Sequence, residues 1–152
     1  MTNALQKAWE EVLRPMFLRP KRVQVAALCY RQTETGKDIL LITSRDTGRW
    51  IVPKGWPIKG LDGPGAALRE AWEEAGVKEA EIIPEPVGQY EYIKGLDTGG
   101  STPVLTQVYL TKVQQLDNEY PEAGERTRKW FTPEDAANMV QEPELQDMLR
   151  AL

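Results

Sequence analysis

Three glutamates, Glu70, Glu73 and Glu74, have a spacing that could build a metal-binding surface. The sequence around them predicts a helix, and at about 100° per residue the three carboxylates fall within an arc of about 100°. Like charges three or four residues apart repel by roughly 0.2–0.5 kcal/mol per pair. A divalent cation turns that repulsion into attraction, and magnesium prefers carboxylate oxygens together with retained waters. Glutamates that only cover an exposed helical face would give the same spacing.

The absence of histidine and the single cysteine narrow the chemistry further. Without histidine there is no Ser-His-Asp or Cys-His nucleophile system and no histidine-ligated metal. Cys29 alone forms neither an internal disulfide nor a cysteine zinc cluster, and its apolar neighbours favour a packing role. Acid–base and metal chemistry therefore falls to carboxylates, which favour hard cations such as magnesium, manganese or calcium.

The helix that carries the glutamates needs a core-facing side and defined ends. We expect the start at Asp62 or Gly63, with Pro64 in the first turn, and the end at Gly76 in a left-handed conformation. The preceding stretch, residues 55–65, reads GWPIKGLDGPG and must be a shaped loop, because glycine and proline interrupt regular elements. Four residues are predicted to form the stripe that faces the core: Leu68, Ala71, Trp72 and Ala75.

The remaining pattern alternates short strands with few helices. Strands are predicted at residues 23–30, 39–43, 50–52, 80–83, 87–93, 104–113 and 127–131. Helices are predicted at about residues 3–14, from residue 133, and over roughly 143–152. The 152 residues suit one domain, with a mixed β-sheet in an α/β layer sandwich (class α/β, or α+β).

The loop and helix together resemble the Nudix box. That pattern is a glycine, five residues, a glutamate, seven residues, then Arg-Glu-apolar-x-Glu-Glu-x-Gly-apolar. Gly55 matches the opening glycine, and residues 69–77 (REAWEEAGV) fill the second half; Leu61 stands where the family has its early glutamate. The resemblance implies a single domain with an α/β/α sandwich over residues 1–152. The departure at Leu61 leaves metal binding in place but puts the usual loop stabilisation, or full activity, in doubt. Residues 41–55 and 128–131 are similar to the diphosphoinositol-polyphosphate and diadenosine-polyphosphate phosphohydrolase branch.

The resemblance also implies roles for individual residues. It implies Mg²⁺ (or Mn²⁺) held by Glu70 and Glu74, with Glu73 as a third metal ligand or as the general base, and Arg69 orienting a glutamate. A backbone carbonyl of Lys54 or Gly55 would be a further ligand. In some relatives an acid in the position of Glu122 or Glu125 adds a ligand or base, although loop acids are more often simply solvated. Five cations could form a phosphate clamp: Lys21, Arg45, Arg49, Lys54 and Lys59.

The resemblance thus implies a pyrophosphohydrolase acting on a phosphorylated small molecule, with a dinucleoside polyphosphate or an inositol pyrophosphate as the preferred substrate. The net charge of −4 gives no global attraction for nucleic acid. Neither a membrane-spanning run nor a secretory signal is evident, so we expect a cytoplasmic protein. We expect it to be a monomer or a homodimer. Two alternatives stay open: a non-catalytic Nudix-like module that binds a phosphorylated ligand, motivated by Leu61, and a globular domain whose acids have no function.

Overall fold

The computed structural model describes residues 22–152. The predicted helix at about residues 3–14 and the predicted phosphate ligand Lys21 lie outside the described residues.

Eight strands of the described chain form one mixed sheet with the central order β3-β2-β1-β7-β5. Its central strands, β1 and β7, run parallel, and the other pairings among the described strands are antiparallel. Strand β4 adds to β1, β6 to β7, and β8 to β2. The strands are β1 (Arg22–Thr33), β2 (Gly36–Thr43), β3 (Trp50–Ile51), β4 (Lys54–Gly55), β5 (Val77–Ile82), β6 (Gly88–Gly95), β7 (Ser101–Leu116) and β8 (Arg128–Phe131).

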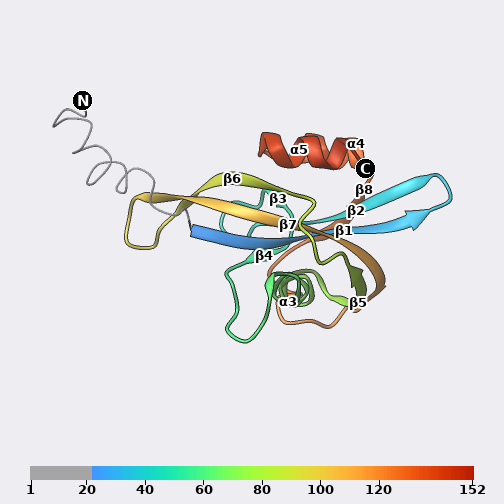
Figure 1. The fold of residues 1–152 in the computed structure, drawn as a ribbon, viewed down its shortest axis with the longest axis horizontal. Helices are drawn as coiled ribbons and strands as arrows, with labels where there is room; N and C mark the ends of the chain where they lie inside the picture. Colours follow the sequence, from blue (N-terminus) through green and yellow to red (C-terminus); the bar gives the residue numbers. More distant parts are fainter. Residues whose placement is uncertain (1–21) are drawn as a thin grey trace, which may run out of the picture.

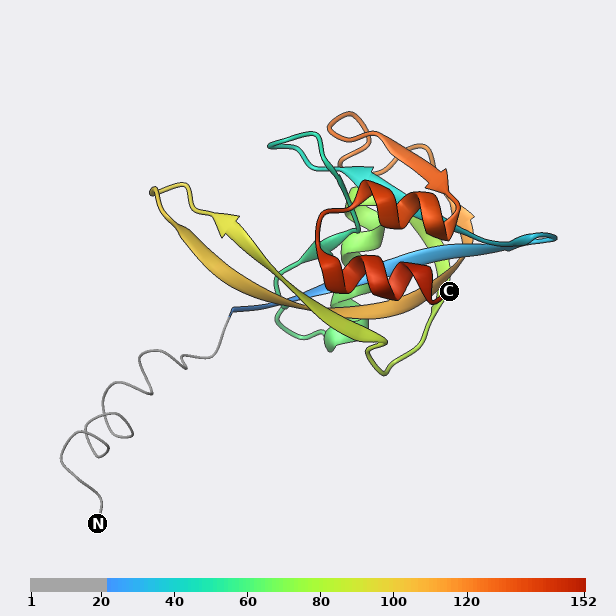
Figure 2. The same ribbon diagram turned by 90° about the horizontal axis from the view of Figure 1, so that it is seen from above.

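Helices cover both faces of this sheet. Helix α3 (Gly63–Ala75) lies on one face, and α4 (Pro133–Met139) and α5 (Pro143–Arg150) lie on the other (Figure 1). From above, α4 and α5 lie side by side across the sheet, while the β6–β7 hairpin extends beyond it (Figure 2). The prediction of an α/β layer sandwich with a mixed sheet is therefore confirmed.

Strand β1 shows why the sheet needs helices on both sides. Its residues alternate between two hydrophobic clusters: Ala26 and Leu28 join the cluster under α4 and α5, whereas Ala27 and Cys29 join the cluster under α3. Successive side chains of a strand point to opposite faces, so a strand buried on both sides must be apolar at every position. Cys29 is fully buried, which confirms its packing role and raises the pKa of its thiol to about 12.

The ends of α3 agree with the sequence, but its buried face does not. Asp62 caps the helix by accepting a 2.8 Å hydrogen bond from the Gly65 N–H, and Gly76 ends it with φ of 71°. The prediction that Leu68 and Trp72 face the core is wrong: both are only partly buried, because the helix approaches the sheet through small residues and turns its larger side chains aside. The buried residues of α3 are Ala66, Ala67, Ala71, Glu74 and Ala75.

Several strands extend beyond their predicted limits. Strand β7 begins at Ser101 and ends at Leu116, past the predicted residues 104–113, because its polar ends keep pairing with β6 and β5. Strand β5 begins at Val77, immediately after the helix, rather than at residue 80. None of the helices among residues 22–152 has both the length and the apolar character needed to span a membrane.

Candidate active site

A polar cleft of about 470 Å³ lies between α3, the β4 strand and two loops. Five carboxylate side chains line it, three from α3, one from the loop after β2 and one from the loop after β7: Glu70, Glu73, Glu74, Asp46 and Glu122. Four cationic side chains share the same cleft: Arg45, Lys54, Lys94 and Arg126. The three predicted metal-site glutamates are thus brought to one cavity, of a size typical of small-molecule sites.

Strand β4 fixes the position of the two more buried glutamates. Its residues Lys54 and Gly55 pair with β1, which holds their backbone against α3. The Lys54 N–H donates a 3.3 Å hydrogen bond to Oε1 of Glu74, a residue only 3% exposed. At Gly55 a Cβ atom would lie 2.3 Å from the carboxyl carbon of Glu70, so only glycine permits this close approach.

Burial raises the pKa of two of these carboxyls to about 7. For Glu70 the main cause is desolvation, and the charges of Glu73 and Glu122 add to it. Desolvation also dominates for Glu74, where the nearby cations Arg126 and Lys54 act in the opposite direction. Desolvation likewise lowers the pKa of Lys54 to about 8. The cleft therefore holds groups that change charge near neutral pH, as functional sites often do.

Glu122 and Arg126 come from the loop between β7 and β8. The Glu122 N–H donates a 2.9 Å hydrogen bond to the Glu73 carbonyl, which ties the loop to α3. Arg126 has a side chain only 8% exposed and contacts Glu122 at 3.1 Å and Glu74 at 3.8 Å. The expectation that Glu122 is simply solvated is wrong, since its side chain is 16% exposed and paired, and Arg126 was not predicted. The four-residue spacing of this acid–base pair was the available signal.

The predicted phosphate-binding cations fall in different places. Arg45 lines the cleft and pairs with Glu122 and Glu125, each at 3.4 Å. Lys54 lines it as well, with Nζ 5.1 Å from the centre of the Tyr92 ring. Lys59 is exposed and lines no described cleft.

A neighbouring cavity of about 380 Å³ extends the carboxylate cleft. Ser44, Asp46, Lys54 and Lys94 line both cavities. Arg49 lines only the extension, where it forms a 2.8 Å ion pair with the buried Glu142. Lys94 was not predicted, because a lysine near the end of a strand gives no sign of which cavity it borders.

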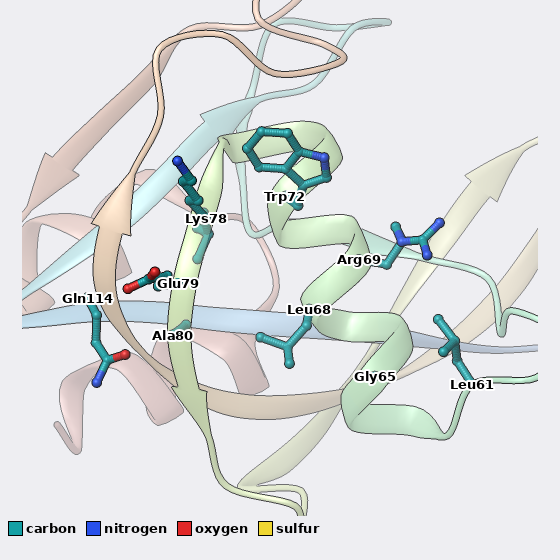
Figure 3. Close-up of a pocket in the computed structure, with 10 residues that line it drawn as sticks. Leu61, Gly65, Leu68, Arg69, Trp72, Lys78, Glu79, Ala80 and Gln114 are labelled. Atoms are coloured by element: carbon teal, nitrogen blue, oxygen red, sulfur yellow. The ribbon is translucent and has the colours of Figure 1, made fainter.

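A separate cleft of about 690 Å³ lies on the outer flank of α3, beside β5 (Figure 3). Leu68 and Trp72 line it, which is where these side chains go instead of the core. Arg69 and Leu61 also line this outer cleft. Arg69 is exposed and makes no ion pair within 4.0 Å to any carboxylate of the described chain. Leu61, the departure from the box, therefore lies outside the carboxylate cleft.

Comparison with known proteins identifies the family. A model of the NUDIX domain matches residues 20–152. The chain belongs to the Nudix family. Human diphosphoinositol polyphosphate phosphohydrolase 3-alpha is 33% identical to this Nudix chain over 121 residues, which cover 78% of the chain and 68% of the relative. The mouse diphosphoinositol polyphosphate phosphohydrolase 2 is 31% identical over 120 residues, covering 78% and 62%. The chain thus spans about two thirds of the length of these relatives.

Solved structures agree with the Nudix fold. An Ap4A hydrolase from C. elegans superposes with a TM-score of 0.64 at 23% identity, covering 86% of this chain and 94% of that one. The E. coli dihydroneopterin triphosphate pyrophosphohydrolase superposes with a TM-score of 0.65 at 17% identity, covering 87% and 94%. At these identities the likeness establishes the fold.

Nudix hydrolases generally use divalent metals, and the donors in this cleft suit one. The acidic side chains that line it all offer oxygen, the ligand that magnesium and manganese prefer. The side-chain-free space at Gly55 accommodates the carboxylate of Glu70. Among residues 22–152, however, no three acidic side chains already lie close enough together to bind one metal ion. A cation would have to draw these carboxylates together against their mutual repulsion.

Proposed function

We propose that this Nudix chain hydrolyses a phosphoanhydride bond in a phosphorylated small molecule with the help of Mg²⁺ or Mn²⁺. The observation that carries the proposal is the presence of two chemistries in one cleft, which is lined by carboxylates of α3 and by four cationic side chains. Carboxylates suit a divalent ion, and the cations suit the phosphate oxygens of a substrate. A bound cation would neutralise charge on those oxygens and lower the pKa of a coordinated water.

In this proposal the residues of the cleft have different roles. Glu70 and Glu74 hold the metal, and Glu73 either completes the set of ligands or accepts the proton of the attacking water. Arg45, Lys54 and Lys94 bind the charged phosphates. The water oxygen forms a bond to phosphorus as the anhydride P–O bond breaks, and the leaving phosphate takes the bonding electrons. Both products then carry separate negative charges, which favours their release.

Within this reaction class we propose inositol pyrophosphates or dinucleoside polyphosphates as substrates. Support for the first comes from the names of the relatives, which are diphosphoinositol polyphosphate phosphohydrolases. The branch resemblance of residues 41–55 supports both. The cavity beside Arg49 and Lys94 extends the carboxylate cleft, so a substrate with several phosphates could occupy both spaces.

A substrate panel tests the proposal. The chain is incubated with Mg²⁺ and diphosphoinositol polyphosphates, diadenosine polyphosphates or ordinary nucleoside triphosphates, and the products are identified by mass spectrometry. We expect turnover of one of the first two classes, lost in Glu73→Gln. The matched control, Glu85→Gln, changes an exposed glutamate between β5 and β6 and should leave turnover unchanged. No product from any panel member, with the protein folded, would contradict catalysis.

The same panel separates the binding-module alternative. Mg²⁺-dependent binding of a panel compound without product, unaffected by Glu73→Gln, would favour a module that only binds its ligand. Leu61 motivated that alternative, and this residue lines the outer cleft and not the carboxylate cleft.

A further inference from the structure

Arg126 is a well-enclosed cation of the carboxylate cleft. Its side chain is 8% exposed, and its guanidinium contacts three separate elements of the fold. Nη1 donates a 3.1 Å hydrogen bond to the Thr43 carbonyl at the end of β2. Nε and Nη2 donate to Glu122 at 3.2 and 3.1 Å, and Nη2 lies 3.8 Å from Glu74 of α3. One side chain thus connects a strand, a loop and the helix that carries the glutamates.

The contacts of Arg126 fall on one oxygen of each carboxylate. Both hydrogen bonds to Glu122 reach Oε1, and the Glu74 contact is also to Oε1, the atom that accepts from the Lys54 N–H. The recorded contacts of these two carboxylates within the described chain therefore leave Oε2 available to another cation. A buried guanidinium that holds one oxygen while the other stays available is the arrangement expected of a partner that orients metal ligands.

We propose that Arg126 positions Glu74 and Glu122 at the metal site of this chain. The inference rests on the proposed function and adds a residue to it. Arg126 keeps the loop carboxylate of Glu122 beside the helix carboxylates, so that both offer their second oxygen to the same cation. The planar guanidinium suits this role, since its N–H groups bond several acceptors in fixed directions and a lysine ammonium does not.

The role that the resemblance assigns to Arg69 is thereby filled from elsewhere in the chain. Arg69 follows the box pattern in sequence, yet it is exposed and borders the outer cleft (Figure 3). Arg126 lies 57 positions further along the chain and reaches the same helix at Glu74, 3.8 Å away. The positioning role therefore follows from the contacts of Arg126 with Glu74 and Glu122, not from its place in the sequence.

A competing explanation is that Arg126 only anchors the loop between β7 and β8. Arg128 provides the matched control. Arg128 fastens the same loop to α3 through the carbonyls of Ala75 and Asp117, each at 2.8 Å. It also bonds Asn118, and no carboxylate of residues 22–152 forms an ion pair with it. Replacement of Arg128 loosens the loop without touching an acid of the cleft. Replacement of Arg126 removes both the anchoring and the carboxylate contacts.

The experiment compares Arg126→Gln, Arg126→Lys, Glu122→Gln and Arg128→Gln by Mn²⁺ titration, followed by the electron paramagnetic resonance of free Mn²⁺. We expect Arg126→Gln and Glu122→Gln each to weaken Mn²⁺ binding by about tenfold or more. The double variant Arg126→Gln with Glu122→Gln should lose less Mn²⁺ affinity than the two single losses combined, because part of the effect of Arg126 acts through Glu122. Arg128→Gln should keep Mn²⁺ affinity within about threefold, because it touches no ligand.

Turnover gives a second readout, and thermal unfolding shows which variants fold. Arg126→Gln should lower kcat by about tenfold while KM for the substrate stays within about twofold, since Arg126 holds metal ligands and not substrate. If Arg126→Gln does not fold, Arg126→Lys keeps the buried charge and should still bind Mn²⁺ about tenfold more weakly.

Three results would overturn the positioning role. They are wild-type Mn²⁺ affinity in the folded Arg126 variants, equal losses in Arg128→Gln, and fully additive losses in the double variant. Failure of the proposed function looks different: the wild-type chain would turn over no panel substrate. The Mn²⁺ comparison needs no substrate and still tests Arg126 in that case. A wild-type chain that bound no Mn²⁺ would overturn the inference directly.

Discussion

The geometry of the carboxylate cleft depends on the absence of a side chain at Gly55. The Glu70 carboxylate occupies the volume that a side chain at Gly55 would take. We expect Gly55→Ala to displace this carboxylate and to lower turnover by about a hundredfold, the cost of a misplacement near 1 Å. Initial rates with saturating Mg²⁺ measure the effect.

Gly124→Ala is the control for that substitution. A Cβ at Gly124 meets nothing within 4 Å, and the residue lies in the same region of the fold. Its turnover should match the wild type, while both alanine variants should remain folded by circular dichroism. Equal rates for Gly55→Ala and the wild type would show that Glu70 does not need its present position.

Two raised pKa values predict how pH affects the metal-free chain. Burial raises the pKa of Glu70 and Glu74 from the ordinary 4.5 to about 7, so between these values the folded chain holds protons that the unfolded chain releases. Their contribution to stability is therefore present below pH 4.5 and is lost as pH rises through 7. Denaturant unfolding of the wild type should show this fall, and a variant with Gln at both positions should lack it.

Mn²⁺ should reverse that trend, because only the ionised carboxylates bind a cation. Affinity should rise with pH through about 7, and binding there should release protons. Calorimetry in buffers of different ionisation enthalpy counts the protons released. Proton-free binding at pH 7 would mean that the raised carboxyls are not the metal ligands.

At the scale of elements, helix α3 shows what a local pattern determines. Asp62 and Gly76 were identified from residue type, because capping depends on a few neighbouring backbone groups. The buried face was mispredicted, since large apolar residues were assumed to face the core. In the fold the alanines face the sheet and the buried Glu74 faces β4, while Leu68 and Trp72 border the outer cleft.

The contacts that complete the site could not be predicted locally. Glu122 reaches the cleft because its backbone bonds that of Glu73, a pairing between segments far apart in sequence. Arg126, which lies in the same loop, contacts Glu74 at 3.8 Å. Helical spacing and the box pattern identified the three glutamates, which share one short element. The loop carboxylate and its arginine depend on how strand β7 ends beside that helix, which only the whole sheet defines.

At the scale of the molecule, the sheet separates two cores, and the site depends on only one of the helical layers. Helix α3 carries the carboxylates, whereas α4 and α5 pack on the other face. A 2.8 Å ion pair between Arg49 and Glu142 links the start of α5 to the loop that leads into β3. Glu142 occupies the N-cap position of α5 without a capping hydrogen bond; Oε1 pairs with Arg49, and within residues 22–152 the buried Oε2 has no hydrogen-bond partner.

That ion pair leads to a prediction about global stability. Glu142 is 7% exposed and Arg49 23%, so Glu142→Gln leaves a partly buried guanidinium without its counter-ion. We expect the free energy of unfolding to fall by about 2 kcal/mol, less than the roughly 3–5 kcal/mol of a fully buried pair because Arg49 keeps some solvent. Urea unfolding with a fixed m value measures it, and the exposed Glu144→Gln should cost less than about 1 kcal/mol.

A double replacement shows whether the ion pair itself stabilises the fold, or whether stability falls only when one of its charges is left unpaired. Arg49→Met with Glu142→Leu removes both charges and fills a similar volume, which often restores the stability lost by breaking a buried pair. Recovery in the double variant would mean that the free energy of unfolding reflects an unpaired charge. If its turnover nonetheless stayed low, Arg49 would be needed at the cavity beside Lys94 for substrate. A double variant as unstable as Glu142→Gln would instead contradict the stability argument, because no charge would remain unpaired.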